Sequence, residues 1–253
     1  MRVGYCFGIT LPLLQWITPQ EICKKDKMEL CKIVESVVHS GVDVIQVRDQ
    51  GAHSAAIHAA AMTVVNKARE WEQKRGNKIH VIYNMNSDQD LLGNESLLNV
   101  IKDRVPPKDL LDALGGVHFP ERMIEYCEFV FEKSISPEKK LVGTSVHSVE
   151  SALSALNCSI SLDYLQVGTM FPTESHIGKI PEGVELIRDI KNHPALNSIP
   201  LIGVGGIQST NAAQVLKAGA SGIASIRSLL NPQEASTLRQ LLNEFKTQHS
   251  ASF

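Results

Sequence analysis

Short apolar runs alternate with amphipathic stretches along almost the whole chain. The runs are rich in β-branched residues and end at glycine, proline or small polar residues, which is typical of buried strands. Nearly every gap between two runs carries apolar residues at helical spacing, so the pattern predicts strands and helices in strict alternation. The predicted strands cover residues 3–10, 42–48, 79–84, 116–119, 141–146, 164–170, 201–204 and 222–226.

Two of the helical patterns have recognisable ends. The stretch PQEICKKDKMELCKIVESVVHSG has Pro19 near its start and Gly41 just past its end, and TNAAQVLKAG has Thr210 as N-cap and Gly219 as terminator. Strand runs such as PLIGV are apolar on both faces, which indicates a parallel sheet covered by helices. Eight such units in 253 residues match a TIM barrel, whereas a doubly wound open sheet more often has six strands and an early glycine fingerprint. We therefore predict an α/β fold, a single TIM barrel over residues 1–253.

One segment, residues 85–114, departs from this regular alternation. It is longer than a usual connection between a strand and a helix, and its first half is polar. We expect an insertion after the third strand or a lid over the barrel mouth. No stretch of the chain has the composition of a linker between domains.

Composition and charge exclude several classes of partner. The chain is 43% hydrophobic and 21% charged, with a formal net charge of -2, and no basic run is dense enough to follow a phosphate backbone. No apolar run approaches the roughly 18 residues that a membrane helix needs. The apolar N-terminal stretch is broken by Gly8 and Pro12 and lacks a cleavage site. We expect a cytoplasmic protein that binds neither nucleic acid nor membrane.

The cysteines do not predict a structural framework. They are odd in number, scattered, and contain no C-x-x-C pair, so neither a disulfide framework nor a zinc site is expected. We predict that they are buried apolar fillers in a reducing compartment. They are Cys6, Cys23, Cys31, Cys127 and Cys158.

Residues whose backbone N–H groups could bind a ligand follow the last two predicted strands. Gly205 and Gly206 come after the seventh strand, and Ile226 and Arg227 lie at the end of the eighth. In TIM barrels phosphate groups often bind between these two loops, on backbone N–H groups. A tight strand-to-helix turn alone would also call for glycine. Because two openings occur at matching places, we predict a phosphate-binding site formed by these four residues.

Five motifs, taken in order and spacing, carry a family resemblance. The stretches VDVIQVRDQ, GGVHFPER, LVGTSVHSVESALSAL, DYLQVGTMFPTESHIGK and IPLIGVGGIQSTNAAQVLKAGASGIASIRSLL resemble the thiamine phosphate synthase and TenI family of TIM barrels. The resemblance runs from the second predicted strand to the last helix. It implies a small phosphate of the thiazole phosphate class as substrate, and it leaves a homodimer open.

The family resemblance implies two activities, and the residues separate them. The synthase joins a pyrimidine pyrophosphate to a thiazole phosphate, and its pattern has Q-x-R-x-K after strand two and T-x-T-K in the sixth loop. Gln46 and Arg48 match the first pattern, but Gln50 and His176 stand at the two lysine places. Lys179 is a candidate to restore part of the missing charge.

The two aspartates that hold magnesium in the synthase are also absent. By the resemblance, Met85 and Met123 occupy their places, and a thioether is not a ligand for a hard cation. A shifted alignment would bring Asp88, Asp90 or Glu121 to these places. We therefore expect no cofactor, with magnesium required only if the chain is a synthase.

The TenI branch matches the remaining motifs better. Its tautomerase aromatises a carboxylated thiazole phosphate, and the resemblance implies that His147, just past strand five, is its functional histidine. A base with a pKa near neutral can move a proton across one face of a ring. A strand-end histidine satisfied by a neighbour is the alternative for His147, since some synthases carry one there. His118 is expected to be packed rather than catalytic.

Further residues at the predicted barrel mouth are candidates for substrate binding. Gln46 and Arg48 would bind a carboxylate or fill a polar layer. Thr173 and Ser175 lie on a loop that would contact the substrate or form a solvated lid. The complete set of predicted substrate-binding residues is Gln46, Arg48, Asn84, Ser145, Thr173, Ser175, His176 and Lys179.

Three functions therefore remain open at the level of sequence. The first is a TenI-like isomerase that uses His147, and it is the one that the motifs favour. The second is a divergent synthase, and the third is a barrel that binds a phosphate without chemistry.

Overall fold

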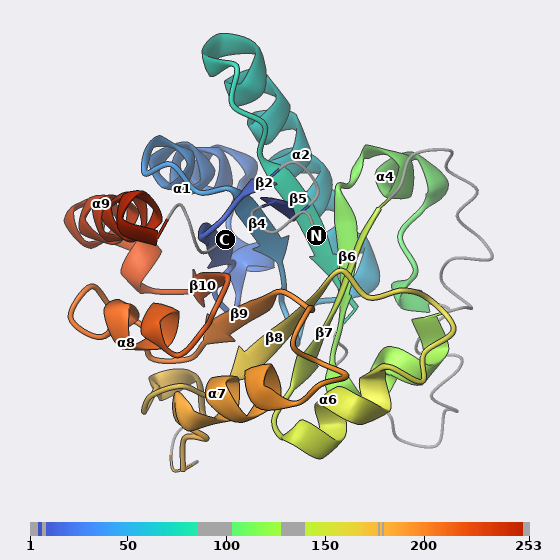
Figure 1. Cartoon of the computed structure of the whole chain (residues 1–253). Helices are drawn as coiled ribbons and strands as arrows, with labels where there is room; N and C mark the ends of the chain where they lie inside the picture. Colours follow the sequence, from blue (N-terminus) through green and yellow to red (C-terminus); the bar gives the residue numbers. More distant parts are fainter. Residues whose placement is uncertain are drawn as a thin grey trace.

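The strands form one closed barrel with helices around it (Figure 1). The computed structural model describes residues 5–6, 9–85, 103–127, 140–176, 178 and 180–249. All eight neighbouring strand pairs of the barrel are parallel, in the order β10-β3-β4-β5-β6-β7-β8-β9, so the predicted TIM barrel is confirmed. Its strands are β3 (Leu13–Ile17), β4 (Val44–Val47), β5 (His80–Asn84), β6 (Gly116–Phe119), β7 (Leu141–Val146), β8 (Tyr164–Gly168), β9 (Leu201–Val204) and β10 (Gly222–Ser225).

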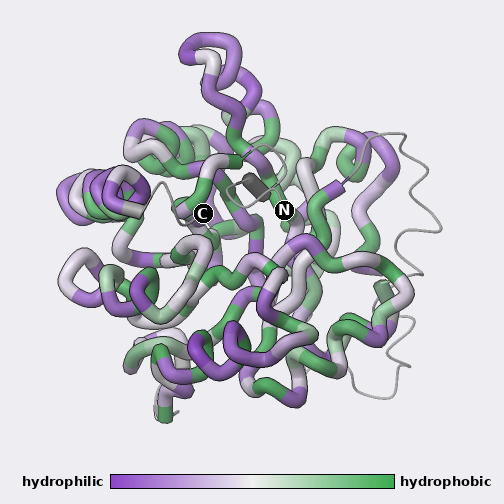
Figure 2. Tube along the Cα trace, in the orientation of Figure 1, coloured by the Kyte–Doolittle hydropathy of each residue, from purple (hydrophilic) through white to green (hydrophobic). Residues whose placement is uncertain are grey.

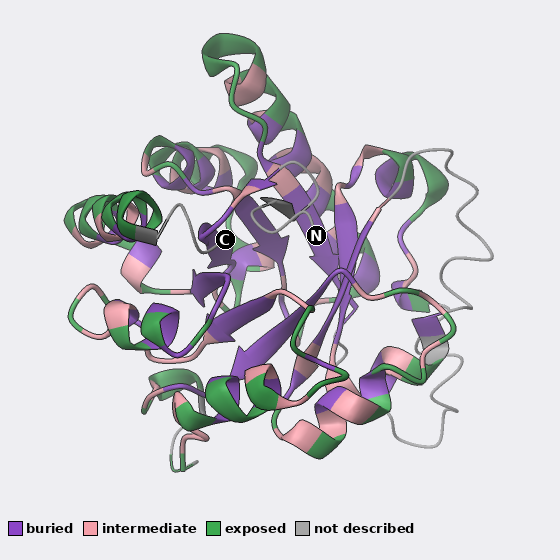
Figure 3. Ribbon diagram, viewed as in Figure 1, coloured by how far each residue is buried: buried purple, intermediate pink, exposed green. Residues whose placement is uncertain are grey.

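The helices lie outside the strands and bury their apolar faces against them, which leaves their polar faces exposed (Figures 2 and 3). No helix in the described part of the chain is long and apolar enough to span a membrane. The α-helices are α1 (Lys27–His39), α2 (Ser54–Arg75), α4 (Lys108–Ala113), α6 (Val149–Ala155), α7 (Glu185–Asn192), α8 (Ala212–Lys217) and α9 (Pro232–His249). The 3-10 helices are η1 (Ile22–Lys24), η3 (Glu121–Tyr126), η4 (Glu174–His176) and η5 (Ser228–Leu230).

The barrel interior changes from apolar to polar along the strands. Leu13, Val44 and Ile82 belong to a buried apolar cluster near the N-terminal ends. Two residues further along the same strands stand Gln15, Gln46 and Asn84, which are buried polar side chains. Because successive side chains of a strand alternate between its faces, both sets point into the barrel. The fold therefore collects polar groups at the C-terminal mouth.

The first predicted strand is wrong in position. The barrel begins with β3 (Leu13–Ile17), every residue of which is buried, and not with residues 3–10. Tyr5–Cys6 (β1) and Ile9–Thr10 (β2) pair with each other as a small antiparallel sheet. Ile9 packs in the inner apolar cluster, so this segment covers the N-terminal end of the barrel. The apolar run is longer than one strand, and hydrophobicity alone did not show which part enters the sheet.

Two helix starts also differ from the sequence patterns. Helix α1 begins after Asp26, whose side chain accepts a hydrogen bond from the Glu29 N–H, and Pro19 lies outside it. Helix α8 follows Asn211 rather than the predicted cap Thr210. In both cases the helix starts after a polar residue that lies closer to the apolar stripe than the predicted one.

The predicted insertion contains one of the barrel helices. Lys108–Ala113 forms α4, which lies between β5 and β6 in the chain and contacts α2. Met85 is fully buried directly after β5. The part of the insertion at residues 86–102 lies outside the described residues, so its predicted role as a lid stays a prediction.

The expectation of unpaired cysteines is wrong for one pair. Cys127 and Cys158 form a disulfide, with their Cα atoms 7.4 Å apart. The two residues are 31 positions apart in the chain and close in space because η3 and α6 pack together. Spacing along the sequence contained no signal for that contact. Cys23 and Cys31 are free and partly buried.

Candidate active site

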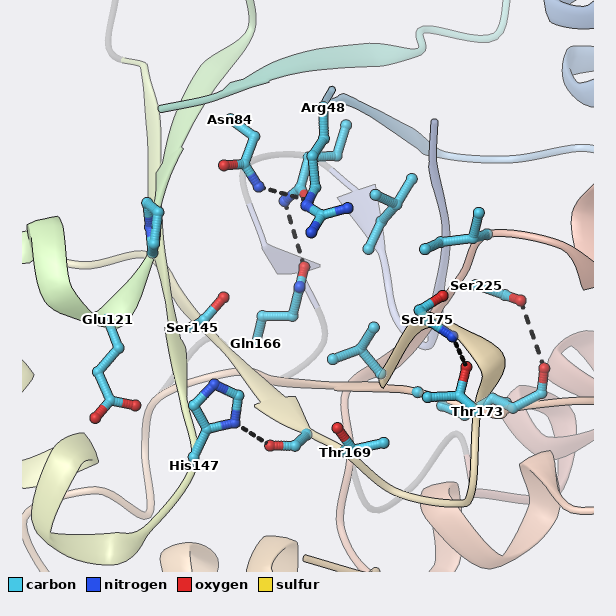
Figure 4. Close-up of a pocket in the computed structure, with 18 of the residues that line it drawn as sticks. Arg48, Asn84, Glu121, Ser145, His147, Gln166, Thr169, Thr173, Ser175 and Ser225 are labelled. Carbon is cyan, nitrogen blue, oxygen red and sulfur yellow. Dashed lines mark hydrogen bonds between the residues drawn. The ribbon is translucent and has the colours of Figure 1, made fainter. Parts of the chain in front are cut away.

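A cavity of about 920 Å³ opens at the C-terminal ends of the strands. Side chains on, or just after, all eight barrel strands contribute to its lining, which is where TIM-barrel enzymes hold their substrates. Figure 4 shows part of this lining, with His147 and Arg48 pointing inward from different walls. The predicted residues that line it are Gln46, Arg48, Asn84, Ser145, His147, Thr173, Ser175, Gly205, Gly206, Ile226 and Arg227. Of the other two predicted residues, Lys179 and the side chain of His176 lie outside the described residues.

Carboxamide side chains form the floor of the cavity. Asn84 Nδ2 donates to Gln46 Oε1 at 3.2 Å, and Gln46 Nε2 donates to Gln166 Oε1 at 3.3 Å. Gln15 Nε2 donates to the same Gln166 oxygen at 3.3 Å. Gln15 and Gln166 were not predicted, although each is a lone polar residue within an apolar strand run; Gln46 was predicted from the family resemblance instead. Gln46 thus belongs to a polar layer, one of its two predicted roles.

A second buried network supports Ser145. His118 Nδ1 lies 2.9 Å from the Tyr164 hydroxyl, and His118 Nε2 lies 2.9 Å from Ser145 Oγ. Complete burial lowers the pKa of His118 to about 3, with a smaller contribution from the nearby Arg48 cation. The imidazole is therefore neutral, and it orients the Ser145 hydroxyl at the cavity wall. His118 is packed, as the sequence predicted.

Arg48 presents a positive charge inside the cavity. Its backbone is fixed by Thr18, whose hydroxyl donates to the Arg48 carbonyl at 2.6 Å and accepts from the Arg48 N–H at 2.8 Å. Burial lowers the pKa of Arg48, although the carboxylate of Asp49 opposes this effect. The described residues provide no hydrogen-bond acceptor for its guanidinium group. A desolvated guanidinium without a partner favours binding of an anionic ligand.

His147 stands just past β7 with one ring nitrogen already engaged. Its Nδ1 contacts the carbonyl oxygen of Gly168, and because a carbonyl can only accept, Nδ1 carries the proton. In the neutral imidazole this tautomer leaves the other nitrogen, Nε2, as the acceptor. The backbone N–H of His147 donates to Ser151 Oγ at 3.0 Å, which fixes the residue at the start of α6. His147 is 46% exposed and lines the cavity, so the base faces the space that a ligand would fill.

Glu182 lies behind His147 and was not predicted from the sequence. Its Oε1 is 3.8 Å from His147 Nδ1, and its Oε2 accepts a hydrogen bond from the Thr169 N–H. The Gly183 N–H in turn donates to the Thr169 carbonyl at 3.2 Å. A carboxylate at this distance stabilises an imidazolium if His147 takes up a proton. Glu182 lies three residues beyond the motif that ends at Lys179, and only the folded chain brings it to His147.

The predicted phosphate site is a cup of backbone N–H groups. The Gly205 carbonyl accepts from the Phe171 N–H at 3.0 Å, and the Gly206 carbonyl accepts from Asn211 Nδ2 at 3.0 Å. Within the described part of the chain, the N–H groups of Gly205, Gly206, Ile226 and Arg227 have no acceptor. Four such donors around one cavity suit a phosphate group.

Both glycines are required by geometry. Gly205 and Gly206 have φ angles of 101° and 63°, and both angles disfavour residues with a side chain. A Cβ atom at Gly206 would lie 2.5 Å from the Pro172 carbonyl oxygen, and one at Gly205 would lie 2.4 Å from Thr169 Cγ2. The loop after β8 therefore presses against the cup from one side, while the N–H groups line the other.

The rim of the cup carries the remaining predicted residues. Thr173 and Ser175 lie in the loop after β8, where the Ser175 N–H donates to Thr173 Oγ1 at 3.3 Å. Arg227 forms an exposed ion pair with Glu174 of η4. This pair connects the loops after β8 and β10 over the phosphate cup. Ion pairing leaves the Arg227 side chain less available to a ligand than its backbone N–H group.

The donor set of the described residues does not fit a magnesium ion. Met85 and Met123, at the places of the two synthase aspartates, have side chains that are fully buried in the apolar core. The carboxylates among the described lining residues are those of Glu121 and Glu174, and Glu174 is already paired with Arg227. No cluster of three or more potential metal ligands occurs in the part of the chain that the structure describes. Asp88 and Asp90 lie outside it.

Comparisons with known proteins agree with the geometry at the level of family. Residues 14–229 match the family described as "Thiamine monophosphate synthase". The thiamine-phosphate synthase of Shouchella clausii is 27% identical over 215 residues, which cover 85% of this chain and 87% of that protein. The thiamine-phosphate synthase of Clostridium botulinum strain Kyoto is 29% identical over 206 residues, 81% of this chain and 85% of that protein.

A solved structure gives the same assignment of fold. The thiamine phosphate pyrophosphorylase from Pyrococcus furiosus superposes with a TM-score of 0.63 and 23% sequence identity, covering 92% of this chain and 96% of that one. The names of these relatives favour the synthase, the alternative that the sequence motifs ranked second, over the isomerase. The family match, which spans all eight barrel strands, establishes that this chain belongs to the thiamine monophosphate synthase family.

Proposed function

We propose that the chain is a metal-independent isomerase that transfers a proton within a carboxylated thiazole phosphate. The observation that carries the proposal is His147, a base that lines the cavity with Nδ1 engaged by the Gly168 carbonyl and Nε2 available. It stands beside an N–H cup suited to phosphate and a guanidinium suited to a carboxylate. The ligand therefore has an anionic group at each end and a reactive carbon between them.

The proton transfer follows from this arrangement. The phosphate binds the N–H groups of Gly205, Gly206, Ile226 and Arg227, and the carboxylate pairs with Arg48. His147 Nε2 removes the proton from the ring carbon next to the carboxylate, and the electron pair of that C–H bond enters the ring. The exocyclic double bond then takes a proton, which completes the aromatic ring. Glu182 stabilises the imidazolium between the two steps.

A divergent synthase is the second candidate, because the relatives carry that name. It would need carboxylates around the pyrophosphate of its second substrate. The buried Met85 and Met123 weigh against this reaction, and among the described residues that follow β5 and β6 Glu121 is the one carboxylate that lines the cavity. Magnesium would be a cofactor only under this alternative.

The test is a spectroscopic turnover assay with the carboxylated thiazole phosphate tautomer, in the presence of EDTA. We expect rapid aromatisation by the wild type and a loss of about 100-fold or more in His147→Ala, which is the usual contribution of a general base. His53→Ala is the matched control, because His53 is exposed and does not line the cavity.

A parallel reaction contains pyrimidine pyrophosphate, thiazole phosphate and magnesium. Formation of thiamine phosphate without aromatisation would replace the isomerase by the synthase. Binding of the thiazole phosphate with neither reaction would leave a non-catalytic phosphate-binding barrel.

A further inference from the structure

Glu121 lines the cavity with a carboxyl group, one oxygen of which has no partner among the described residues. Its Oε2 is buried and has no hydrogen bond within the described part of the chain. Glu121 and His147 both line the cavity, and both are labelled in Figure 4. A buried carboxylate oxygen without a partner is unfavourable, so a partner is expected from the ligand or from a water molecule inside the cavity.

The position of Glu121 is fixed by the same elements that hold His147. Glu121 begins η3, where the Met123 N–H donates to the Pro120 carbonyl at 2.8 Å. Thr144 of β7 donates its hydroxyl to the Phe119 carbonyl at 3.0 Å, directly before this turn. Helix η3 packs against β7 and α6, and His147 lies between those two elements in the chain. The two side chains are therefore held on one rigid unit.

We propose that Glu121 is the second proton-transfer group of the isomerisation, an inference that rests on the proposed function. His147 Nε2 accepts the proton from the ring carbon, and the Glu121 carboxyl group gives its own proton to the exocyclic carbon. One C–H bond breaks and one forms, while the O–H bond of Glu121 is replaced by an N–H bond on His147. Bulk water then takes the proton from the imidazolium and supplies a new proton to the Glu121 carboxylate, and no redox partner is involved.

Two groups explain the geometry better than one. The atom that loses a proton and the atom that gains one are different carbons, and His147 is tied at Nδ1 to the Gly168 carbonyl and at its backbone N–H to Ser151. A fixed imidazole is well placed for one of these carbons only. Glu121 supplies a second acid at the other carbon, because its carboxyl group lines the same cavity.

The experiment compares Glu121→Gln, Glu121→Asp and a matched control. Glu125→Gln is the control, because Glu125 is exposed on the same 3-10 helix and does not line the cavity. We expect Glu121→Gln to lower kcat about 100-fold with KM changed less than about threefold, Glu121→Asp to recover part of the rate, and Glu125→Gln to match the wild type. Unfolding midpoints of the variants establish that each one is folded.

Isotope labelling separates one proton-transfer group from two. Substrate that carries deuterium on the ring carbon is converted in ordinary water, and the exocyclic carbon of the product is analysed by mass spectrometry. Two groups predict no deuterium at that carbon, whereas transfer by His147 alone would leave part of the label there. Retained label, or full activity of Glu121→Gln alongside an inactive His147→Ala, would overturn the role of Glu121 only. A wild type without aromatisation would overturn the proposed function and this inference together.

Discussion

The residues directly after β9 and β10 and those directly after β5 and β6 follow strands of the same barrel, but the first set offers backbone groups and the second is distinguished by its side chains. The first pair offers backbone N–H groups of Gly205, Gly206, Ile226 and Arg227. After β5 and β6 the side chains matter instead, and the resemblance implies that the buried Met85 and Met123 stand where a synthase has metal-binding aspartates.

The comparison shows which part of a site can change its chemistry without disturbing the fold. A backbone cup depends on φ angles and on close approach of another loop, so replacing its residues disturbs the fold itself. A side-chain site can exchange its chemistry while the strands remain in place. A barrel can therefore keep a backbone N–H cup while the side chains at the other loops of the mouth are exchanged.

The largest effect on stability is expected from placing aspartates at positions 85 and 123. Met85→Asp places a carboxylate where the native side chain is fully buried among apolar residues, and burying an unpaired charge costs several kcal/mol of unfolding free energy. Met85→Leu is the matched control and should cost less than about 1.5 kcal/mol. Urea unfolding with and without magnesium measures both variants. A Met85→Asp, Met123→Asp double variant that magnesium stabilises above the wild type would contradict the view that these two positions do not form a metal site.

The next largest effect, on ligand affinity, is expected at the backbone N–H cup. Gly206→Ala adds a Cβ atom 2.5 Å from the Pro172 carbonyl oxygen, so the cup or the loop after β8 must shift. We expect affinity for the thiazole phosphate, measured by calorimetry, to fall at least about tenfold, or about 1.4 kcal/mol. Gly76→Ala is the control, because Gly76 has a similar φ of 75° but nothing within 4 Å, and it ends α2 away from the site. Equal affinities of the two variants would show that the cup does not need its close fit.

The sequence predicted the parts of the site that depend on short-range signals. Glycines directly after an apolar run indicated the cup, and the family resemblance indicated Gln46, with a polar layer as one of its two predicted roles. Contacts that join distant segments had no such signal. Glu182 reaches His147 from another loop, and Cys158 meets Cys127 only because α6 and η3 pack together.

The first strand was misplaced for a related reason. Residues 9–17 are almost uniformly apolar, and Ile9 is buried in the inner cluster just as Leu13 is. Burial therefore does not distinguish the segment that covers the barrel end from the strand that enters the sheet. Only pairing with β10 and β4, which the sequence cannot display, selects Leu13–Ile17.

A smaller effect, on substrate binding, is expected from replacing Arg48, a side chain that lines the same cavity as the N–H cup. Arg48→Met removes the guanidinium from the cavity but leaves the N–H cup intact. KM for the carboxylated substrate should rise about tenfold, the loss of one charge-assisted contact, while binding of a thiazole phosphate without a carboxylate should stay within about twofold. Arg48→Lys keeps the charge and should recover part of the affinity. A parallel loss for both ligands would mean that Arg48 contacts the phosphate.

The smallest expected effect is the pH dependence of the unfolding free energy. It arises from the side chain of His118 and not from the backbone N–H groups. His118 has a pKa of about 3 in the folded protein because it is completely buried, against about 6.5 when exposed. Between these values the unfolded chain binds more protons, so the unfolding free energy falls as pH falls below about 6.5 and is independent of this group at higher pH.

From pH 6.5 to pH 5.5 the contribution of His118 is at most about 1.4 kcal/mol, and urea unfolding over this range measures it. His118→Gln should be less stable at pH 7 but should lose less stability on acidification. The N–H cup has no titrating group, so phosphate affinity corrected for the ionisation of the ligand should remain constant over the same range. A slope unchanged by His118→Gln would assign the pH dependence to other buried groups, of which His80, with a pKa lowered to about 4 by burial, is the first to examine.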